Sequence, residues 1–272
     1  ARMTGRVARN EFQTTVLGAL VGAALAFGLV LLIEYLDDTI RTVDQATQAL
    51  GLPTLAVIPK FGKSRDSYSE RLIAYRQPDS PVSEEYRTLR TNLMFSANGG
   101  TAVFLITSPG PGDGKTITVA NLAVTMAVAG WRVLLIDADL RRPRLHDIFN
   151  VDNRVGLSTL LSLDPSDLLA AEMPLDRLPP HYAECIQETE IPGLTMIASG
   201  YIPLNPAEVL GSANMQQWFK FFRSSPDIDI ILIDTPPVLI AADSAVLASN
   251  LDIPTVMVIE AGRTRPGGAL RA

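Results

Sequence analysis

The stretch that decides the fold is Leu105–Ala123, "LITSPGPGDGKTITVANLA". It runs from apolar residues through a turn rich in glycine and proline into a segment of helical character. A strand, a glycine-rich turn and a helix, in that order, build a phosphate-binding loop. The strict pattern G-x-x-x-x-G-K-[ST] nevertheless fails, because its first glycine position holds Pro109.

The loop keeps the residues that contact phosphate. Gly110, Gly112 and Gly114 allow consecutive backbone amides to face one anion, and the following helix adds its free N–H groups. We expect Lys115 to reach the β- and γ-phosphates and the Thr116 hydroxyl to bind Mg²⁺. The alternative is a glycine-rich turn that merely precedes a lysine, and the strand before and helix after disfavour it. The stretch therefore predicts an ATP site.

Acidic residues follow two further apolar runs. "VLLIDADLRRP" places Asp137 and Asp139 just past one predicted strand, and "IILIDTPPV" places Asp234 at the end of another. Buried carboxylates are costly unless they face a cation or a polar ligand. Asp234 has the position of a Walker B acid that holds Mg²⁺ through water. Each acid alone could cap a helix, but three beside one phosphate loop favour a metal–nucleotide site.

Short apolar runs alternate with helical patterns through most of the chain. The runs are unalternating and mostly β-branched, as buried parallel strands are, and lie at 102–106, 133–136, 194–198, 230–233 and 255–259. Helices are expected at 81–95, 115–129, 206–222 and 242–250. The predicted fold class is α/β, a doubly wound, mostly parallel sheet of the P-loop NTPase type, with ligands at the carboxyl ends of its strands. Residues 150–193 hold several prolines and are expected to form an irregular insertion.

An uncharged run of 22 residues separates Glu11 from Glu34. At about 1.5 Å per residue it spans roughly 33 Å, enough to cross a bilayer. It has no polar stripe, so a transmembrane helix over 12–36 is favoured over a buried helix or a signal sequence. Arginines precede the run and acidic residues follow it, which by itself places the N-terminus in the cytoplasm. Because the ATP site must be cytoplasmic, we expect instead a further span upstream.

A short segment joins this span to the predicted α/β domain. Thr42–Gly51 is expected to be an amphipathic helix, with Thr42 and Gln45 as a capping box and Gly51 as its C-cap. Leu52–Pro59 is an apolar run ended by proline and is expected to be a short strand. Residues 60–81 turn polar and are expected to form a surface linker.

The composition narrows the class of partner. The net charge of −6 argues against nucleic acid, since phosphate backbones select basic surfaces. The single cysteine, Cys185, excludes an internal disulfide framework and fits a reducing compartment. His146 and His181 stand alone, and neither is expected to bind a metal.

The order of the phosphate loop, "LLIDADLR" and "ILIDTPP" resembles the bacterial tyrosine kinases (BY-kinases) of capsule and exopolysaccharide synthesis. In that family the additional Asp-x-Asp-x-Arg motif is called Walker A′. The span followed by "EYLDDTIRT" and "LGLPTLAVIP" resembles the end of a Wzz-type polysaccharide co-polymerase module. "LNPAEVL" at 204–210 matches a family signature, and "EEYRTLRTNL" matches the family's Glu-x-x-Arg-x-x-Arg helix through Glu84, Arg87 and Arg90.

The resemblance implies a membrane-anchored, ATP-dependent protein-tyrosine autokinase that regulates polymerisation and export of capsular polysaccharide or exopolysaccharide. Its implied cofactors are ATP and Mg²⁺, and its implied location is the bacterial plasma (inner) membrane with the kinase domain in the cytoplasm. The implied organisation is the end of an extracytoplasmic module (1–11), a transmembrane helix (12–36), a juxtamembrane segment and linker (37–80), and a C-terminally incomplete kinase domain (81–272).

The resemblance also assigns roles to residues. Asp137 is the candidate that accepts or orients the tyrosine hydroxyl proton, with Asp139 and Asp234 nearer the metal. The expected catalytic residues are Lys115, Asp137, Asp139 and Asp234. The expected metal ligands are Thr116, Asp139 and Asp234. The expected nucleotide contacts are Gly110, Gly112, Asp113, Gly114, Lys115, Thr116, Ile117 and Arg141.

Partners follow from the same resemblance. Glu84, Arg87 and Arg90 fall on one helix face, where spacing alone favours a solvated ion pair of little energetic value. The family implies instead a contact between subunits, so a homo-oligomeric ring is expected, together with membrane lipid, polysaccharide polymerase and export machinery, and a cognate tyrosine phosphatase. The family usually ends in a tyrosine cluster, and this sequence shows none near its end, so either the tail is missing or this member lacks the cluster. The tyrosines present are Tyr35, Tyr68, Tyr75, Tyr86, Tyr182 and Tyr201.

Two other functions compete with a kinase. Septum-site and plasmid-partition ATPases share the expected fold, but they carry a lysine where this loop has Gly110, in K-G-G-x-G-K-T. A non-catalytic co-polymerase scaffold that controls polysaccharide chain length is the second alternative. The full set of acids argues against an inactive site.

Overall fold

The computed structural model describes residues 11–62, 67, 69–95, 101–166, 168 and 173–270. Residues 1–10 of the expected extracytoplasmic stretch, and Tyr68, lie outside the described residues. The chain divides into two units, residues 1–39 and residues 40–272.

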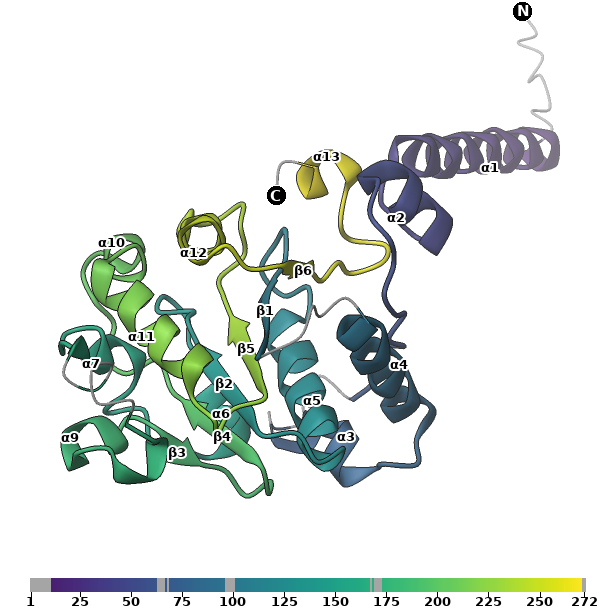
Figure 1. Cartoon of the computed structure of the whole chain (residues 1–272). Helices are drawn as coiled ribbons and strands as arrows, with labels where there is room; N and C mark the ends of the chain where they lie inside the picture. The colour runs from purple at the N-terminus through teal and green to yellow at the C-terminus, as the bar shows by residue number, and fades with distance from the viewer. Residues whose placement is uncertain are drawn as a thin grey trace, which may run out of the picture. The chain divides into compact units, whose positions relative to one another are not determined.

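The first unit contains helix α1 (Glu11–Leu36) (Figure 1). Residues 14–36 of this helix have a mean hydropathy of 2.7, and the apolar window within them contains no buried residue. Its 26 residues extend about 39 Å at 1.5 Å per residue, more than the roughly 30 Å of a bilayer's hydrocarbon core. The helix therefore has the length and composition that the expected span requires.

The second unit is built on a six-stranded sheet with the order β3-β4-β2-β5-β1-β6. Its strands are β1 (Ala102–Thr107), β2 (Val133–Asp137), β3 (Gln187–Glu188), β4 (Leu194–Ile197), β5 (Ile230–Asp234) and β6 (Thr255–Met257). Every neighbouring pair is parallel except β3 and β4. The five expected strands and the doubly wound α/β class are confirmed, and β3 is an antiparallel edge strand that the sequence analysis missed.

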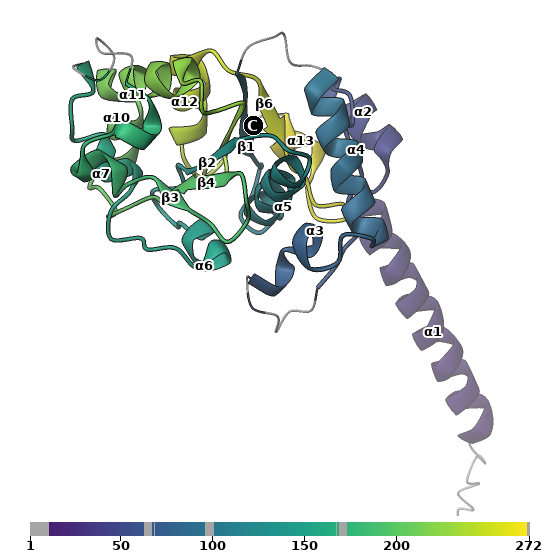
Figure 2. The ribbon, with the colours of Figure 1, turned by 60° about the horizontal axis from the view of Figure 1, so that its bottom comes forward.

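Helices cover both faces of this sheet, as Figure 2 shows with α10, α11 and α12 on one side and α3, α5 and α6 on the other. The first face carries η1 (Ser69–Arg71), α3 (Ile73–Arg76), α4 (Pro81–Phe95), α5 (Lys115–Val128) and α6 (Leu145–Phe149). The second carries α7 (Leu157–Leu160), η2 (Leu175–Arg177), α9 (Pro180–Ala183), α10 (Pro206–Leu210), α11 (Ala213–Ser224) and α12 (Asp243–Leu251). Helices α2 (Val43–Leu50) and α13 (Pro266–Ala269) pack on each other beside β6.

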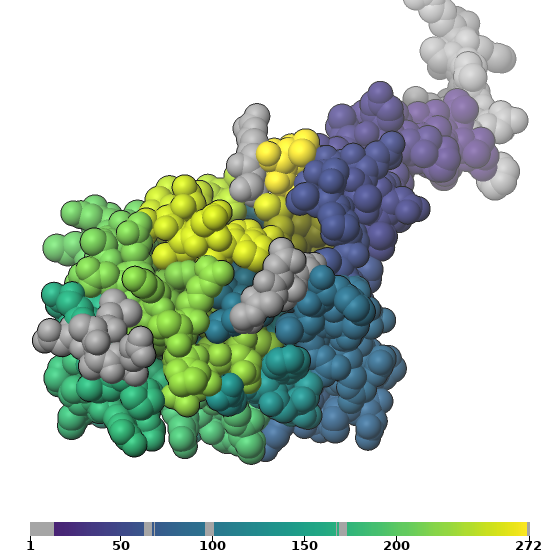
Figure 3. All heavy atoms as spheres, in the orientation of Figure 1, coloured from purple at the N-terminus to yellow at the C-terminus, as the bar shows by residue number. Residues whose placement is uncertain are grey.

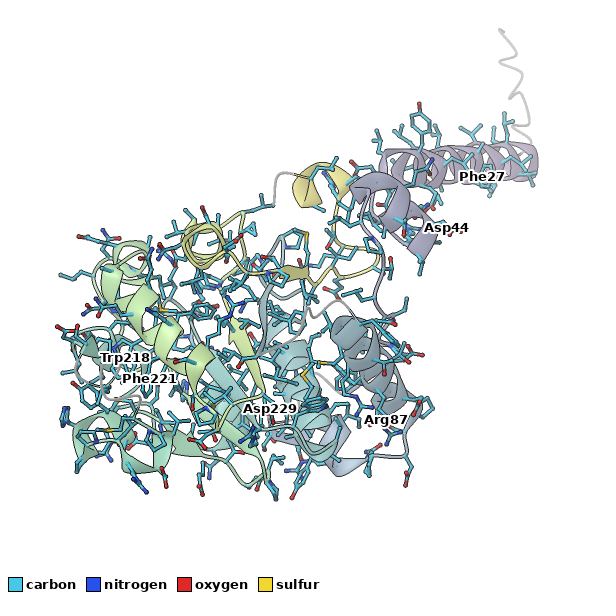
Figure 4. The ribbon with its side chains drawn as sticks, viewed as in Figure 1. Phe27, Asp44, Arg87, Trp218, Phe221 and Asp229 are labelled. Carbon is cyan, nitrogen blue, oxygen red and sulfur yellow. The ribbon has the colours of Figure 1, made fainter. Side chains whose placement is uncertain are left out.

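The sheet separates two hydrophobic cores because successive strand residues point to opposite faces. Along β1, Phe104 packs with the α5 side and Leu105 with the α11 side. Trp218 of α11, labelled with Phe221 in Figure 4, belongs to the second core and is fully buried. Its indole N–H donates to the carbonyl of Leu160 at 2.8 Å, so this large ring is buried without an unpaired polar atom.

The strand order brings three carboxyl ends together. β5 lies between β1 and β2, and Asp234 at its end is the register partner of both Ile106 in β1 and Asp137 in β2. Because register partners in parallel strands share a face and a level, the loop after β1 leaves the sheet beside the acidic ends of β2 and β5. The residues of the candidate site therefore lie at the carboxyl ends of β1, β2 and β5.

Three expectations about local structure are wrong. Leu52–Pro59 forms no strand; its apolar side chains pack against the first core, and Asn92 donates to the carbonyl of Leu55 at 2.6 Å. The helix expected at 206–222 is two helices, because α10 ends at its C-cap Gly211 and Ser212 caps α11 by accepting from the amide of Met215. The error at 206–222 comes from apolar periodicity that continues across this interruption.

The third wrong expectation concerns residues 60–81, which are not only a surface linker, because Leu72, Ile73 and Ala74 are buried in the first core. The other local signals hold. The capping box of α2 is formed by Thr42 and Gln45, and Gly51 ends the helix in the left-handed region at φ 66°. The 150–193 insertion contains only short elements, α7, η2, α9 and β3, within the part of it that the structure describes. The short helices α3 and α6 were not expected, since one or two turns leave too little periodicity to detect.

Candidate active site

The phosphate loop, residues 108–114, joins the end of β1 to the start of α5. Gly112 and Gly114 have φ values of 86° and 90°, a region that strains other residues. The loop is also held by its own polar groups: the Gly110 amide donates to Asp113 Oδ2 at 2.9 Å, and the Ser108 hydroxyl donates to the Gly110 carbonyl at 2.8 Å. Burial raises the pKa of Asp113, against the opposing effect of the Gly110 amide. The curled loop and the helix N-terminus behind it have the form of an anion-binding site.

Lys115 joins the loop to two acidic strand ends. Its ammonium lies 3.0 Å from Asp139 Oδ2, 3.3 Å from Asp234 Oδ1 and 3.0 Å from Thr116 Oγ1. The Thr116 hydroxyl donates to Asp234 Oδ2 at 2.8 Å. The carboxylates of Asp139 and Asp234 are almost entirely buried. Residues from three separate parts of the sequence thus form one contiguous polar cluster at the carboxyl edge of the sheet.

Asp137 lies beside this cluster but faces backbone amides. Its Oδ1 accepts from the amide of Asp139 at 3.2 Å, and its Oδ2 accepts from the amides of Leu145 at 3.1 Å and Arg144 at 3.3 Å. A carboxylate has about four acceptor positions, so these bonds leave one on Oδ1. The side chain is fully buried at the end of β2.

The electrostatics of the cluster follow from burial and close charges. Burial raises the pKa of Asp137 to about 8, and the nearby charge of Asp234 adds to the effect. Burial also raises the pKa of Asp234, with Lys115 and Thr116 opposing it. Burial alone would lower the pKa of Lys115, but Asp234 and Asp139 outweigh it and the pKa is raised. The site is therefore an excess of buried carboxyl groups around one retained ammonium, an arrangement that favours additional cations.

Buried hydroxyls fix the loop that follows Asp234. Thr107 and Ser244 both donate to the carbonyl of Pro236, at 2.9 and 2.6 Å. Thr235 donates to the carbonyl of Ile106 at 2.9 Å, which ties the ends of β1 and β5 together. These contacts hold the Asp234 segment against the phosphate loop without using the acid itself.

Arg141 and Ile117, two of the expected nucleotide contacts, have partners within the protein. The Arg141 guanidinium forms a bidentate ion pair with Asp243 at the start of α12, with N–O distances of 2.7 and 3.0 Å, and the hydrogen bond to Asp243 raises its pKa. The Asp243 side chain is fully buried. The carbonyl of Ile117 accepts from the buried Asn121 side chain at 2.9 Å. The nucleotide roles of Arg141 and Ile117 stay predictions.

The residues expected at a subunit contact lie on α4. Arg87, which Figure 4 labels on α4, pairs with Glu84 at 2.6 Å and donates to the carbonyl of Pro78 at 2.7 Å. Arg90 donates to the carbonyl of Thr125 in α5 at 3.2 Å. Tyr86 on the same helix is fully buried, and burial raises the pKa of its hydroxyl. The exposed Glu84–Arg87 pair thus leaves its outer surface available to a partner.

The oxygen atoms of the cluster are of the kind that binds a hard metal cation. Two carboxylates, Asp139 and Asp234, and the Thr116 hydroxyl supply hard oxygen atoms, which suit Mg²⁺ or a similar cation together with phosphate oxygens. Among the residues that the structure describes, no group of three or more His, Cys, Asp or Glu side chains could hold a metal alone. The residues therefore fit a metal that arrives with a nucleotide.

Two residues that contact the predicted site residues, Asp243 and Arg263, were not predicted from the sequence. Asp243 carries the ion pair to Arg141, and its position at the start of a predicted helix was the available signal. Arg263 donates to the carbonyls of Pro111 and Gly112 in the phosphate loop. Arg263 is 152 positions from Pro111 and 151 from Gly112 in the sequence, and no motif surrounds it. Only the pairing of β6 with β1 brings them together.

Comparisons with known proteins show which proteins this chain is similar to. The family model described as "AAA domain" matches residues 103–259. The tyrosine-protein kinase YwqD of Bacillus subtilis is 39% identical over 214 residues, covering 77% of this chain and 82% of that protein. The putative tyrosine-protein kinase EpsB of Ralstonia solanacearum is 36% identical over 244 residues, covering 86% of this chain but 30% of that protein.

A solved structure agrees with these relatives. The BceF tyrosine kinase domain superposes with a TM-score of 0.68 at 30% identity, covering 86% of this chain and 93% of that domain. The chain thus corresponds to nearly the whole of one solved kinase domain and to less than a third of the length of the EpsB relative.

Proposed function

The chain belongs to the bacterial tyrosine-protein kinases, and on this premise we propose that it is the membrane-anchored, ATP-dependent autokinase part of a protein that regulates polymerisation and export of a capsular polysaccharide or exopolysaccharide. The observation that carries the proposal is the cluster in which Lys115 contacts Thr116, Asp139 and Asp234 behind the curled phosphate loop. The relatives named as tyrosine-protein kinases disfavour a partition-type ATPase and a non-catalytic scaffold.

Each part of the cluster has a role in phosphoryl transfer. The amides around Gly110, Gly112 and Gly114 bind the phosphates, and Lys115 neutralises charge on the β- and γ-phosphates. Thr116, Asp139 and Asp234 are the residues that would hold Mg²⁺, which supplies further charge neutralisation to the transferred group. Phosphoryl transfer depends mainly on positioning and electrostatics, so this small set of side chains is sufficient.

Asp137 is our candidate for the residue that receives the tyrosine proton. As the tyrosine oxygen bonds to the γ-phosphorus, the bond from phosphorus to the ADP oxygen breaks and the hydroxyl proton passes to the carboxylate. The acceptor position left on Oδ1 supports this role. Asp139 is the competing candidate, because its carboxylate points at Lys115 within the cluster.

The location and partners complete the proposal. Helix α1 anchors the chain in the bacterial inner membrane, with the kinase domain in the cytoplasm where ATP is available. The segment before the helix is the end of a Wzz-type co-polymerase module. The partners are other copies of the chain in a ring, membrane lipid, the polysaccharide polymerase and export machinery, and a cognate tyrosine phosphatase. Exposed tyrosines such as Tyr75 and Tyr201 are open to phosphorylation, whereas Tyr86 is not.

Labelled ATP separates the candidate functions. The chain in detergent micelles is incubated with γ-labelled ATP and Mg²⁺, and label is followed on tyrosine and as free phosphate. We expect label on tyrosine, and about 100-fold less in Asp137→Asn, the lower end of general-base effects. Free phosphate alone would indicate an ATPase, and neither product would indicate a scaffold. An Asp139→Asn variant that loses tyrosine label while Asp137→Asn keeps it would transfer the proton-acceptor role to Asp139.

The α4 surface predicts a change of oligomeric state. Replacing Arg87 and Arg90 together by alanine should convert an oligomer to a monomer in light scattering, because both charges of the proposed contact are lost. Arg76→Ala, which removes an exposed arginine on α3, is the matched control and should leave the mass unchanged. Since Arg90 also contacts Thr125 within the chain, thermal melting of both variants must accompany the measurement. A folded double variant with the unaltered mass would refute the interface.

A further inference from the structure

We infer that Arg263 is a positioning residue of the phosphate loop, acting from outside the loop on its backbone carbonyls. The inference rests on the proposed function, since it assigns a support to the same nucleotide site. Arg263 Nη2 donates to the carbonyl of Pro111 at 3.0 Å, and Nη1 donates to the carbonyl of Gly112 at 3.4 Å. Bound phosphate would use the amides of this loop, so one loop can make both sets of contacts.

The Arg263 guanidinium is itself oriented. Glu260 lies 3.1 Å from Nη1 and 3.9 Å from Lys60. A single guanidinium therefore bridges a carboxylate and two loop carbonyls, which its planar set of five donors permits and a lysine ammonium would match poorly. Its charge also acts on Asp113, the side chain that closes the loop onto the Gly110 amide.

The turn that carries Arg263 is fixed to its surroundings. The amides of Arg263 and Thr264 both donate to the Glu260 carbonyl, and the Glu260 amide donates to the Thr264 hydroxyl. Two backbone hydrogen bonds tie the turn to Ile40: its amide donates to the Thr264 carbonyl at 2.9 Å, and its carbonyl accepts from Gly262 at 2.8 Å. The backbone of the turn that carries Arg263 is thus fixed by hydrogen bonds.

The sheet topology places the turn that carries Arg263 beside the phosphate loop. β6 pairs in parallel with β1, so the turn after β6 and the phosphate loop after β1 leave the same edge of the sheet from neighbouring strands (Figure 1). Figure 3 shows the yellow C-terminal segment packed against the dark blue α2 on the surface of this unit. Ile40, Ala46 and Ala269 form the small buried cluster beneath that contact.

Gly112 shows how closely the arginine approaches. A Cβ added at Gly112 would lie 2.9 Å from Arg263 Nη1, inside van der Waals contact. The loop therefore uses glycine here for its positive φ and also for the close packing of the guanidinium. Although 56% of the Arg263 side chain is exposed, its hydrogen bonds to two successive loop carbonyls limit the backbone conformations that the loop can adopt.

A positioning role predicts a loss of nucleotide affinity with little change in turnover. Using the full chain in phospholipid nanodiscs with Mg²⁺, we expect Arg263→Ala to bind a fluorescent ATP analogue about tenfold more weakly, and Glu260→Gln about threefold. The double variant should bind no more weakly than Arg263→Ala alone, because Glu260 acts through the arginine. At saturating ATP, the rate of tyrosine phosphorylation should stay within about twofold of that of the unaltered chain.

Arg132→Ala is the matched control, since Arg132 pairs with Asp229, labelled in Figure 4 at the start of β5, far from the carboxyl edge. It should bind the analogue like the unaltered chain. If Arg263→Ala melts at a lower temperature, Arg263→Gln repeats the measurement with a side chain that keeps hydrogen-bond donors. Unchanged affinity in a folded Arg263 variant would overturn the inference alone. No binding by the unaltered chain would overturn the proposed function, and this inference with it.

Discussion

Replacing Lys115 by methionine should lower the rate of tyrosine phosphorylation roughly 1,000-fold, the loss expected when one preorganised charge-stabilising donor is removed. Methionine keeps much of the length and apolar stem of lysine but has no charge. The ammonium is the group that touches Asp139, Asp234 and Thr116, so its loss removes the cation from a buried set of carboxyl groups. Transfer of label from γ-labelled ATP to tyrosine measures the effect directly.

Lys220→Met is the control for this substitution. Lys220 is exposed on α11, on the face of the sheet opposite to α5, and the same chemical change there should leave the rate within about twofold. Melting curves of both variants separate a loss of chemistry from a loss of structure. A folded Lys115→Met variant that keeps more than a tenth of the normal rate would contradict the role given to the ammonium.

The sequence was sufficient to predict the centre of the site because its residues lie in continuous motifs at strand ends. Lys115 and Thr116 follow the glycine-rich turn directly, and Asp139 and Asp234 come at the ends of short apolar runs typical of buried strands. Parallel strands then deliver these motifs to one edge of a sheet. For these residues, the local motifs together with the fold class were enough to predict that the side chains meet.

The periphery of the site could not be predicted in the same way. Arg263 reaches the loop only because β6 lies beside β1, an order that hydrophobic periodicity does not contain. The failed strand at 52–59 has the same origin. Leu55, Ala56 and Ile58 pack against the first core from an irregular segment, and nothing in the local pattern reveals that no strand edge is available to them.

The motif and the structure assign different roles to Arg141. The Walker A′ pattern assigns it to the nucleotide, whereas the structure pairs it with the buried carboxylate of Asp243. Removing one partner of a buried ion pair costs about 3–5 kcal/mol. Because 42% of the Arg141 side chain is exposed, we expect Arg141→Met to lower the free energy of unfolding by about 3 kcal/mol, the lower end of that range.

Two companion variants identify the cause of this loss. Adding Asp243→Asn to Arg141→Met should recover part of the stability, because the amide is neutral and no longer needs a cation. Arg154→Met, which breaks the exposed pair with Asp152, should cost less than about 1 kcal/mol. Denaturant unfolding measures all three, and ATP titration of the folded variants measures affinity separately. If Arg141→Met weakened ATP binding while stability stayed unchanged, the arginine would serve the nucleotide, and its contact with Asp243 would be incidental.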